Sequence, residues 1–145
     1  ADRVLTSIAK DLDRPRSEVT IVGIHNRRTD YLAFRKNVLK MKPIKKSFFE
    51  SAFDYFRDEY DNVAFVYVSD DMKWGEKKFG HHDDIYFIGC GDADDRECIG
   101  KDFALLSNCD HVVHSQGTFG FWSSFLAGGD TYTEYGVIVR DFYNG

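Results

Sequence analysis

The 145 residues lack the motifs that identify several common classes of protein. There is no G-x-G-x-x-G and no G-x-x-x-x-G-K-[ST], which argues against a standard dinucleotide site or a P-loop. No apolar run is long enough to span a bilayer, and no signal-peptide pattern begins at Ala1. The segment itself is therefore expected to be soluble and to make no membrane contact.

The sequence also lacks an excess of basic residues. Lysine and arginine number 19 against 24 acidic residues, which gives a formal net charge of -5 and an isoelectric point near 5.5. Binding to nucleic acid or to an anionic membrane needs a basic surface, so the overall charge argues against both partners. A local basic pocket remains compatible with this balance.

Cysteine is scarce, and its spacing is uninformative. Cys90, Cys98 and Cys109 include no C-x-x-C pair and are odd in number, so they specify neither a zinc site nor a complete disulfide set. One bridge with one free thiol and three reduced thiols both remain open.

What the chain does contain is enough apolar material for one compact domain. Hydrophobic residues make up 43% of the sequence, including thirteen Phe and eight Tyr, and 30% of residues are charged. Short β-branched runs alternate with stripes at helical spacing. We predict strands at Val19–His25, Val63–Val68, Ile85–Ile88, His111–Ser115 and Val137–Val139. We predict helices at Val4–Leu12, Phe48–Tyr60, Met72–Phe79, Lys101–Asn108 and Phe119–Ala127, with a loop and one short helical turn (Tyr31–Leu39) between Asn26 and Pro43.

Strands separated by helices imply right-handed crossovers and a mainly parallel sheet. The predicted fold class is therefore α/β, a Rossmann-like doubly wound domain covering residues 1–145. Ligands of such sheets lie beyond the carboxyl ends of the strands. The segments at that edge are HNRRTD, SDD, GCGDAD and SQGTFG, and they hold the chemically unusual residues of the chain.

Two adjacent arginines directly follow the first predicted strand. Guanidinium groups bind phosphate through paired hydrogen bonds and stay charged, so Arg27 and Arg28 are candidates for an anion site. Neighbouring residues of an extended chain point in opposite directions, so one arginine can face a ligand while the other pairs with Asp30. An exposed ion-pair cluster is the structural alternative.

Other candidates come from the same edge. Gly117 and Thr118 open a helix whose free N–H groups favour an anion, although Thr118 could simply cap that helix. Asp102, in a predicted first turn, could accept from the paired donors of guanine. His25 could contact a base or donate to phosphate. Metal binding at Ser69–Asp71 is disfavoured because hard cations need converging oxygen ligands.

Taken together, these segments resemble the galactoside α1,2-fucosyltransferases, which use GDP-fucose. The motif HNRRTDY matches the family pattern H-x-R-R-x-D after an apolar strand, and FVYVSDDMKWGEKKF and KDFALLSNCDHVVHSQGTFGFWSSFLAGGD match two further elements. The helix FFESAFDYFRDEY fits as well. The resemblance spans nearly the whole chain, in order and in spacing.

The resemblance implies the donor-binding half of a GT-B-type glycosyltransferase that transfers fucose with inversion, without a metal or other cofactor, to the 2-hydroxyl of a galactose-terminated glycan. It implies that Arg27 and Arg28 hold the pyrophosphate, with Asp30 as a candidate base. The implied substrate-binding residues are His25, Ser69, Asp71, Asp102, Gly117, Thr118 and Phe119.

The resemblance also implies an acceptor-side domain, and any membrane anchor, outside this chain. A eukaryotic type II parent enzyme would place the segment on the lumenal side of the Golgi membrane. Two other functions stay open: a catalytically silent domain that binds a GDP-sugar or glycan, and a structural α/β module.

Overall fold

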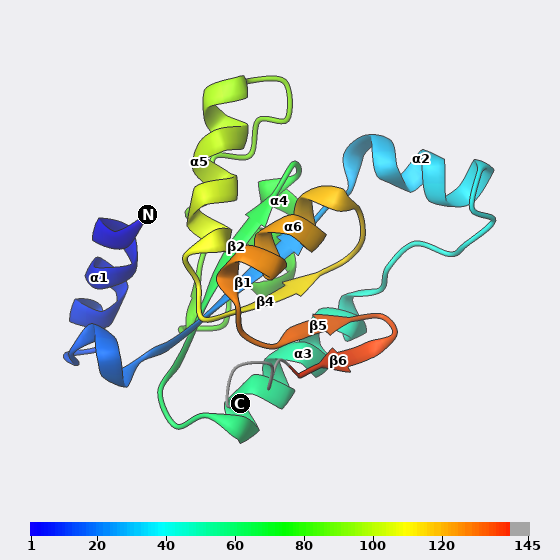
Figure 1. The fold of residues 1–145 in the computed structure, drawn as a ribbon. Helices are drawn as coiled ribbons and strands as arrows, with labels where there is room; N and C mark the ends of the chain where they lie inside the picture. Colours follow the sequence, from blue (N-terminus) through cyan, green and yellow to red (C-terminus); the bar gives the residue numbers. More distant parts are fainter. Residues whose placement is uncertain (140–145) are drawn as a thin grey trace.

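The computed structural model describes residues 1–139 and is built on one six-stranded sheet (Figure 1). The strand order is β3-β2-β1-β4-β5-β6, and every neighbouring pair is parallel except β5 and β6. The strands are β1 (Thr20–Asn26), β2 (Val63–Ser69), β3 (Ile85–Tyr86), β4 (His111–His114), β5 (Thr131–Thr133) and β6 (Gly136–Ile138). The predicted Rossmann-like, mainly parallel sheet is confirmed.

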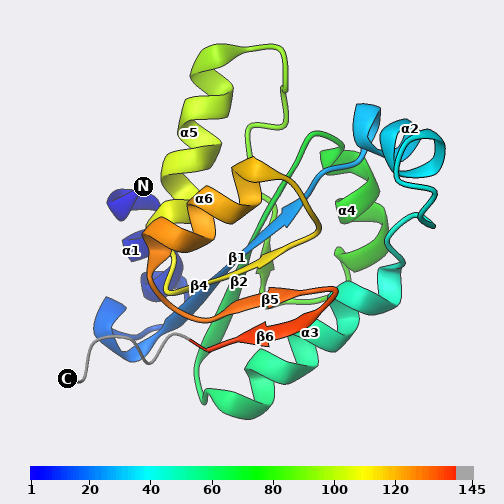
Figure 2. The same cartoon turned by 45° about the vertical axis from the view of Figure 1, so that its right-hand side comes forward.

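Helices cover both faces of the sheet and make three layers (Figures 1 and 2). Helices α1, α5 and α6 lie on one face, and α3 and α4 lie on the other. The helices are α1 (Asp2–Asp11), α2 (Thr29–Asn37), α3 (Lys46–Glu59), α4 (Met72–Phe79), α5 (Arg96–Ser107) and α6 (Thr118–Ala127). None of the helices within residues 1–139 is both long and apolar enough to cross a membrane.

The central strands are apolar on both sides because both of their faces are buried. In β1, Ile21 packs with α1 and α5, whereas Val22 and Ile24 pack with α3 and α4. The second of these layers is aromatic: Phe49 and Phe53 of α3 are fully buried against the sheet. Burial of such side chains contributes roughly 1.5–3 kcal/mol each, which explains why the continuous β-branched and aromatic runs fold as inner strands.

The structure differs from the prediction most in three places. Helix α5 begins at Arg96 rather than Lys101, because the Asp95 carboxylate caps it by accepting from the amides of Glu97 and Cys98. The short helical turn predicted at Tyr31–Leu39 is present as the longer, regular helix α2, which begins at Thr29. Strand β5 was not predicted, and β6 runs antiparallel to it across a tight hairpin.

This topology places a crevice beside β1. Crossovers through α3 lead from β1 to β2 on one side, whereas β4 lies on the other side of β1 and is reached through α5. Helices on opposite faces diverge at such a switch point, and ligands of doubly wound sheets bind there, outside the carboxyl ends of the strands.

Candidate functional site

A cavity of about 110 Å³ opens at this edge of the sheet. It brings together residues from the ends of β1 and β2, the loop before α5, and the first turn of α6. Pockets that enclose a whole drug-sized ligand measure about 300–1,000 Å³, so this cavity accommodates one part of a larger ligand. Five predicted site residues line it: His25, Arg27, Ser69, Asp102 and Phe119. The other five lie outside the lining: Arg28, Asp30, Asp71, Gly117 and Thr118.

Arg27 is fixed through its backbone and paired through its side chain. Its amide donates to the Ser115 hydroxyl at 3.1 Å, and its guanidinium donates to both carboxylate oxygens of Asp30, the shortest contact being 2.9 Å. These hydrogen bonds raise the pKa of Arg27 and lower the pKa of Asp30. A carboxylate with a lowered pKa is a weaker proton acceptor, so Asp30 in this arrangement braces the arginine.

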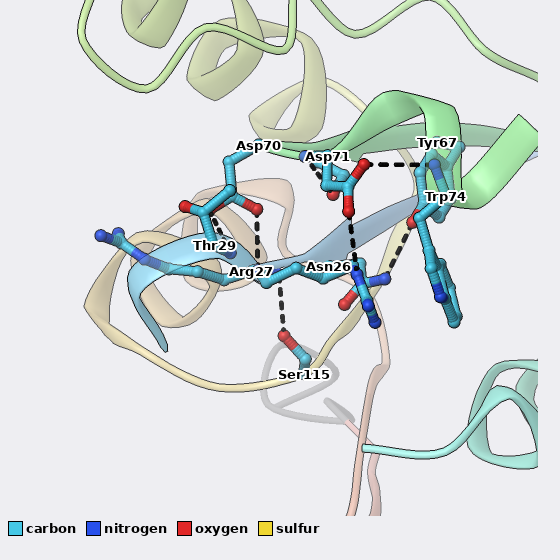
Figure 3. Close-up of polar contacts among 10 residues, drawn as sticks. Asn26, Arg27, Thr29, Tyr67, Asp70, Asp71, Trp74 and Ser115 are labelled. Atoms are coloured by element: carbon cyan, nitrogen blue, oxygen red, sulfur yellow. Dashed lines mark hydrogen bonds and ion pairs between the residues drawn. The ribbon is translucent and has the colours of Figure 1, made fainter. Parts of the chain in front are cut away.

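Arg28 points the other way, as expected for neighbouring residues. Its guanidinium carbon lies 4.1 Å from the centre of the Trp74 ring, and its Nε donates to Asp71 at 3.3 Å. The side chain is only 17% exposed. Figure 3 shows Arg27 extending away from Trp74. Arg28 is therefore held by packing as well as by charge.

Asp70, which the sequence did not single out, organises the turn that carries both arginines. Its Oδ1 accepts from the Arg28 amide at 2.7 Å, and its Oδ2 accepts from the Thr29 amide at 3.1 Å and from the Thr29 hydroxyl (Figure 3). The neighbouring Asp71 instead caps α4, accepting from the Trp74 amide at 3.2 Å. Both acids are visible in the sequence, but the register of β1 against β2 decides which one reaches the Arg28 amide. Across residues 1–139, no three His, Cys, Asp or Glu side chains are placed to share a metal ion.

Asp102 lies in the middle of α5, so its predicted place in a first turn is wrong. Its carboxylate is 8% exposed and accepts from the amides of Cys90 at 2.7 Å and Gly91 at 3.3 Å. A disulfide between Cys90 and Cys98 closes the same loop, while Cys109 is a buried free thiol whose pKa burial raises to about 12. The cysteines thus form one bridge and one free thiol, and Asp102 holds the loop that walls the cavity.

His25 and Phe119 form the inner wall of the cavity. Their ring centres lie 4.9 Å apart. Burial, followed by the nearby His114, lowers the pKa of His25 to about 3, so its imidazole is neutral at pH 7. Its Nδ1 is buried without a hydrogen-bond partner among the described residues. His25 therefore presents an aromatic and neutral polar surface, not a positive charge.

The first turn of α6 is left without a side-chain cap. Gly117 is the N-cap residue, with φ of 100°, and Thr118 is the first helical residue, so the capping role considered for Thr118 is wrong. The amides of this turn remain available to an anion. Gly120 lets the helix approach closely, because a Cβ there would lie 2.7 Å from the Cβ of His114 and 3.0 Å from Nδ1 of His25.

A buried arginine that the sequence did not reveal joins three segments around the site. Arg35 of α2 is 3% exposed. Its Nε donates to the Lys42 carbonyl at 2.9 Å, its Nη1 to the Gln116 side-chain oxygen at 2.7 Å, and Nη1 and Nη2 to the Glu134 carboxylate at 3.0 and 3.1 Å. Tyr31 donates to the same oxygen of Gln116 at 2.8 Å. No local pattern links Arg35 to a partner 99 residues away.

Comparison with known proteins identifies the family of the chain. The family model for glycosyl transferase family 11 matches residues 1–140. The chain is 42% identical over 113 residues to galactoside alpha-(1,2)-fucosyltransferase 1 of Mus musculus, an alignment covering 77% of this chain and 29% of the relative. It is 39% identical over 113 residues to galactoside alpha-(1,2)-fucosyltransferase 2 of Pongo pygmaeus (77% and 32%) and 38% identical over 134 residues to galactoside alpha-(1,2)-fucosyltransferase 1 of Ateles belzebuth (90% and 35%). The chain thus spans about a third of the length of these relatives, and it belongs to glycosyl transferase family 11.

Proposed function

We propose that this chain is the donor-binding region of a galactoside α1,2-fucosyltransferase and that it binds GDP-fucose at the carboxyl edge of the sheet. The observation that carries the proposal is the meeting, at the β1–β4 switch point, of a small aromatic cavity with two arginines and an uncapped helix N-terminus. The relatives are named as galactoside fucosyltransferases, which supports the choice of sugar and acceptor class.

The cavity suits the base, and its rim suits the diphosphate. A flat purine would stack beside His25 and Phe119, and the carboxylate of Asp102 keeps lone pairs for the paired donors of guanine while it holds its two backbone amides. A whole nucleotide sugar exceeds the cavity. Its charged part would therefore extend toward Arg27 and the first turn of α6.

The transfer step explains the need for positive charge at this rim. The bond between fucose C1 and the phosphate oxygen breaks, and its electron pair stays on GDP. The acceptor 2-hydroxyl oxygen attacks C1 from the opposite face, which inverts the configuration, and its proton passes to a base. Preorganised cations and helix amides stabilise the leaving diphosphate in place of a metal, and loss of one such donor costs ~10²–10³ in rate.

Arg27 is the residue we expect to change partners on binding. Its side chain is 39% exposed and bonded to an exposed Asp30, so a diphosphate can replace that partner at little cost. Opening this pair would also restore the basicity of Asp30, which keeps Asp30 as the candidate base. Arg28, which points the other way and is packed on Trp74, would contribute a fixed positive charge from the α4 side of the turn.

A catalytically silent GDP-sugar-binding domain is the second candidate, because the candidate base Asp30 is held in an ion pair with Arg27 that lowers its pKa. A parent enzyme of the proposed kind is expected in the Golgi membrane with this region on the lumenal side. That oxidising compartment permits the bridge between Cys90 and Cys98.

Calorimetric titration of the chain with GDP, GDP-fucose and GMP tests the proposal. We expect GDP and GDP-fucose to bind more tightly than GMP, and Arg27→Ala and Arg28→Ala each to weaken GDP roughly 10- to 150-fold, the worth of a charge-assisted hydrogen bond. Arg14→Ala, which removes an exposed ion pair with Glu18, is the charge-matched control. Absence of binding by all three nucleotides would leave only a structural module. Binding without fucose transfer to a lactose-type acceptor by the full-length enzyme would identify a silent domain.

A further inference from the structure

Positive charge is concentrated in one short segment of an acidic chain. Residues 31–49 contain six of the 19 lysines and arginines and none of the 24 acidic residues. The remainder of the chain therefore carries a formal charge of -11. We call residues 31–49 the basic segment. It begins one residue after Asp30 and so directly adjoins the arginine turn.

Most of this charge is free to meet a ligand. Within the part of the chain that the structure describes, the ammonium groups of Lys36, Lys40, Lys42 and Lys45 are on exposed residues and have no carboxylate within salt-bridge distance. Lys46 is paired with Glu50 at 3.0 Å. Four unpaired cations in so short a stretch repel one another, and an anion bound among them would relieve that repulsion.

The basic segment is held in place beside the site. The buried Arg35 fastens it from inside, donating to the Lys42 carbonyl and to Gln116 of the loop that leads into α6. The Met41 amide donates back to the Arg35 carbonyl at 2.9 Å, which closes the chain after α2 into a tight return. Figures 1 and 2 both show α2 projecting past the carboxyl end of β1. The lysines are therefore carried by a segment that is tied to the loop before α6.

The same segment offers apolar surface suited to a sugar ring. Phe34 is 43% exposed, its ring centre lies 5.5 Å from that of Tyr31, and Val38 and Leu39 are exposed nearby in the chain. The C–H face of a pyranose packs against aromatic and aliphatic side chains of this kind, while lysines bind groups on its edge.

We propose that the basic segment is an acceptor subsite selective for galactosides that carry an anionic group, such as a sulfate or a carboxylate. The inference rests on the proposed function and extends it from the donor to the acceptor class. A compact oligosaccharide meets only the lysines of the segment. A bilayer or a nucleic acid presents a wide anionic surface and would also meet the charge of -11 on the remainder of the chain, which disfavours both.

The test compares 3′-sulfated lactose with lactose in NMR titrations of the chain saturated with GDP. The sulfated sugar should bind more tightly, its advantage should shrink as salt is raised, and shifts should concentrate in residues 31–46. The double variant Lys36→Gln with Lys40→Gln should weaken the sulfated sugar roughly 2- to 30-fold and leave lactose unchanged, from the usual worth of two exposed charge pairs. The control Lys10→Gln with Lys77→Gln makes the same change in net charge on α1 and α4.

Four results would overturn the inference: equal affinity for the two sugars, binding of neither, equal loss in the control variant, or lysine-dependent binding of phosphatidylserine vesicles in place of the sugar. The GDP titration keeps the two proposals separable. Failure to bind GDP would count against the donor site itself, whereas normal GDP binding without preference for the sulfated sugar would remove only the acceptor subsite.

Discussion

The hydrogen-bond network around Arg35 allows a quantitative prediction, because it joins a buried guanidinium to the partly buried carboxylate of Glu134. Arg35 is 3% exposed and the Glu134 side chain 24% exposed, and the two share a pair of contacts at 3.0 and 3.1 Å. Glu134→Ala leaves the guanidinium buried without its counter-charge. Removing one partner of a fully buried pair costs about 3–5 kcal/mol. Since Glu134 keeps some contact with water, we expect about 2–3 kcal/mol.

Arg35→Met keeps the aliphatic volume but removes every donor of the network. It leaves the Gln116 oxygen with only Tyr31 and the Lys42 carbonyl without its side-chain donor, so we again expect a loss of about 2–3 kcal/mol. The double variant should lose clearly less stability than the sum of the losses in the two single variants, because the second substitution removes a group that the first had already left without its partner. We expect a coupling energy of at least about 1 kcal/mol.

The free energy of unfolding of the wild type, the two single variants and the double variant is measured by urea titration, with far-ultraviolet circular dichroism as the signal. The four values are compared at equal m-values. The matched control is the exposed pair of Arg14 and Glu18, at 3.5 Å with side chains 47% and 56% exposed, which should couple by no more than about 0.5 kcal/mol. Additivity of Arg35→Met and Glu134→Ala within about 0.5 kcal/mol would refute the reasoning, since it would mean that the pair contributes no interaction of its own.

Three further predictions concern the walls of the cavity. Replacing Cys90 and Cys98 with serine should lower stability by about 2–3 kcal/mol and weaken GDP binding. Reduction by dithiothreitol should cause the same losses in the wild type and should leave the serine variant unchanged. Burial lowers the pKa of His114 to about 4 and that of His25 to about 3, so the unfolded chain takes up protons first as pH falls below 6.5. Each histidine should cost about 2 kcal/mol of stability by pH 5, so His114→Gln should lose clearly less than the wild type, and equal urea midpoints at pH 7 and 5 would contradict this. Gly120→Ala should cost about 1–3 kcal/mol and weaken GDP binding, whereas Gly100→Ala, with open space around its Cβ, should stabilise α5; similar effects of the two would count against close packing of α6.

The fold could be predicted because the inner strands are recognisable from their apolar residues. Val19–His25 and Val63–Val68 are continuous apolar runs, and only a sheet covered on both faces buries such runs completely. The edge of the sheet gave weaker signals. Strand β5 is the short polar segment Thr131–Thr133, and no local sequence pattern distinguishes it from a loop. It forms because it pairs with β4, which precedes it in the sequence by a whole helix.

The positions of the candidate site residues were predictable, but their partners were not. Strand-end placement correctly brought His25, Arg27 and Ser69 to one cavity. Which acid would hold the arginine turn depends on the register of β1 against β2, where Asn26 lies opposite Ser69, and this register puts Asp70 within reach of the Arg28 amide. Side-chain contacts between strands far apart in the sequence follow from packing, which periodicity does not encode.

The two arginines differ in a way that their adjacency in the sequence conceals. Their backbone amides are both anchored to neighbouring strand ends, Arg27 to Ser115 after β4 and Arg28 to Asp70 after β2, so the turn is fixed before any ligand arrives. The side chains are fixed to different degrees: Arg28 is packed on an aromatic ring, whereas Arg27 is bonded to an exposed carboxylate that water already solvates. Preorganised charge stabilises a leaving group without reorganisation, while an exchangeable charge can open and close with the ligand. Under the proposed function, Arg27 at the cavity would exchange Asp30 for the diphosphate, whereas Arg28 would contribute a fixed positive charge from the side of Trp74.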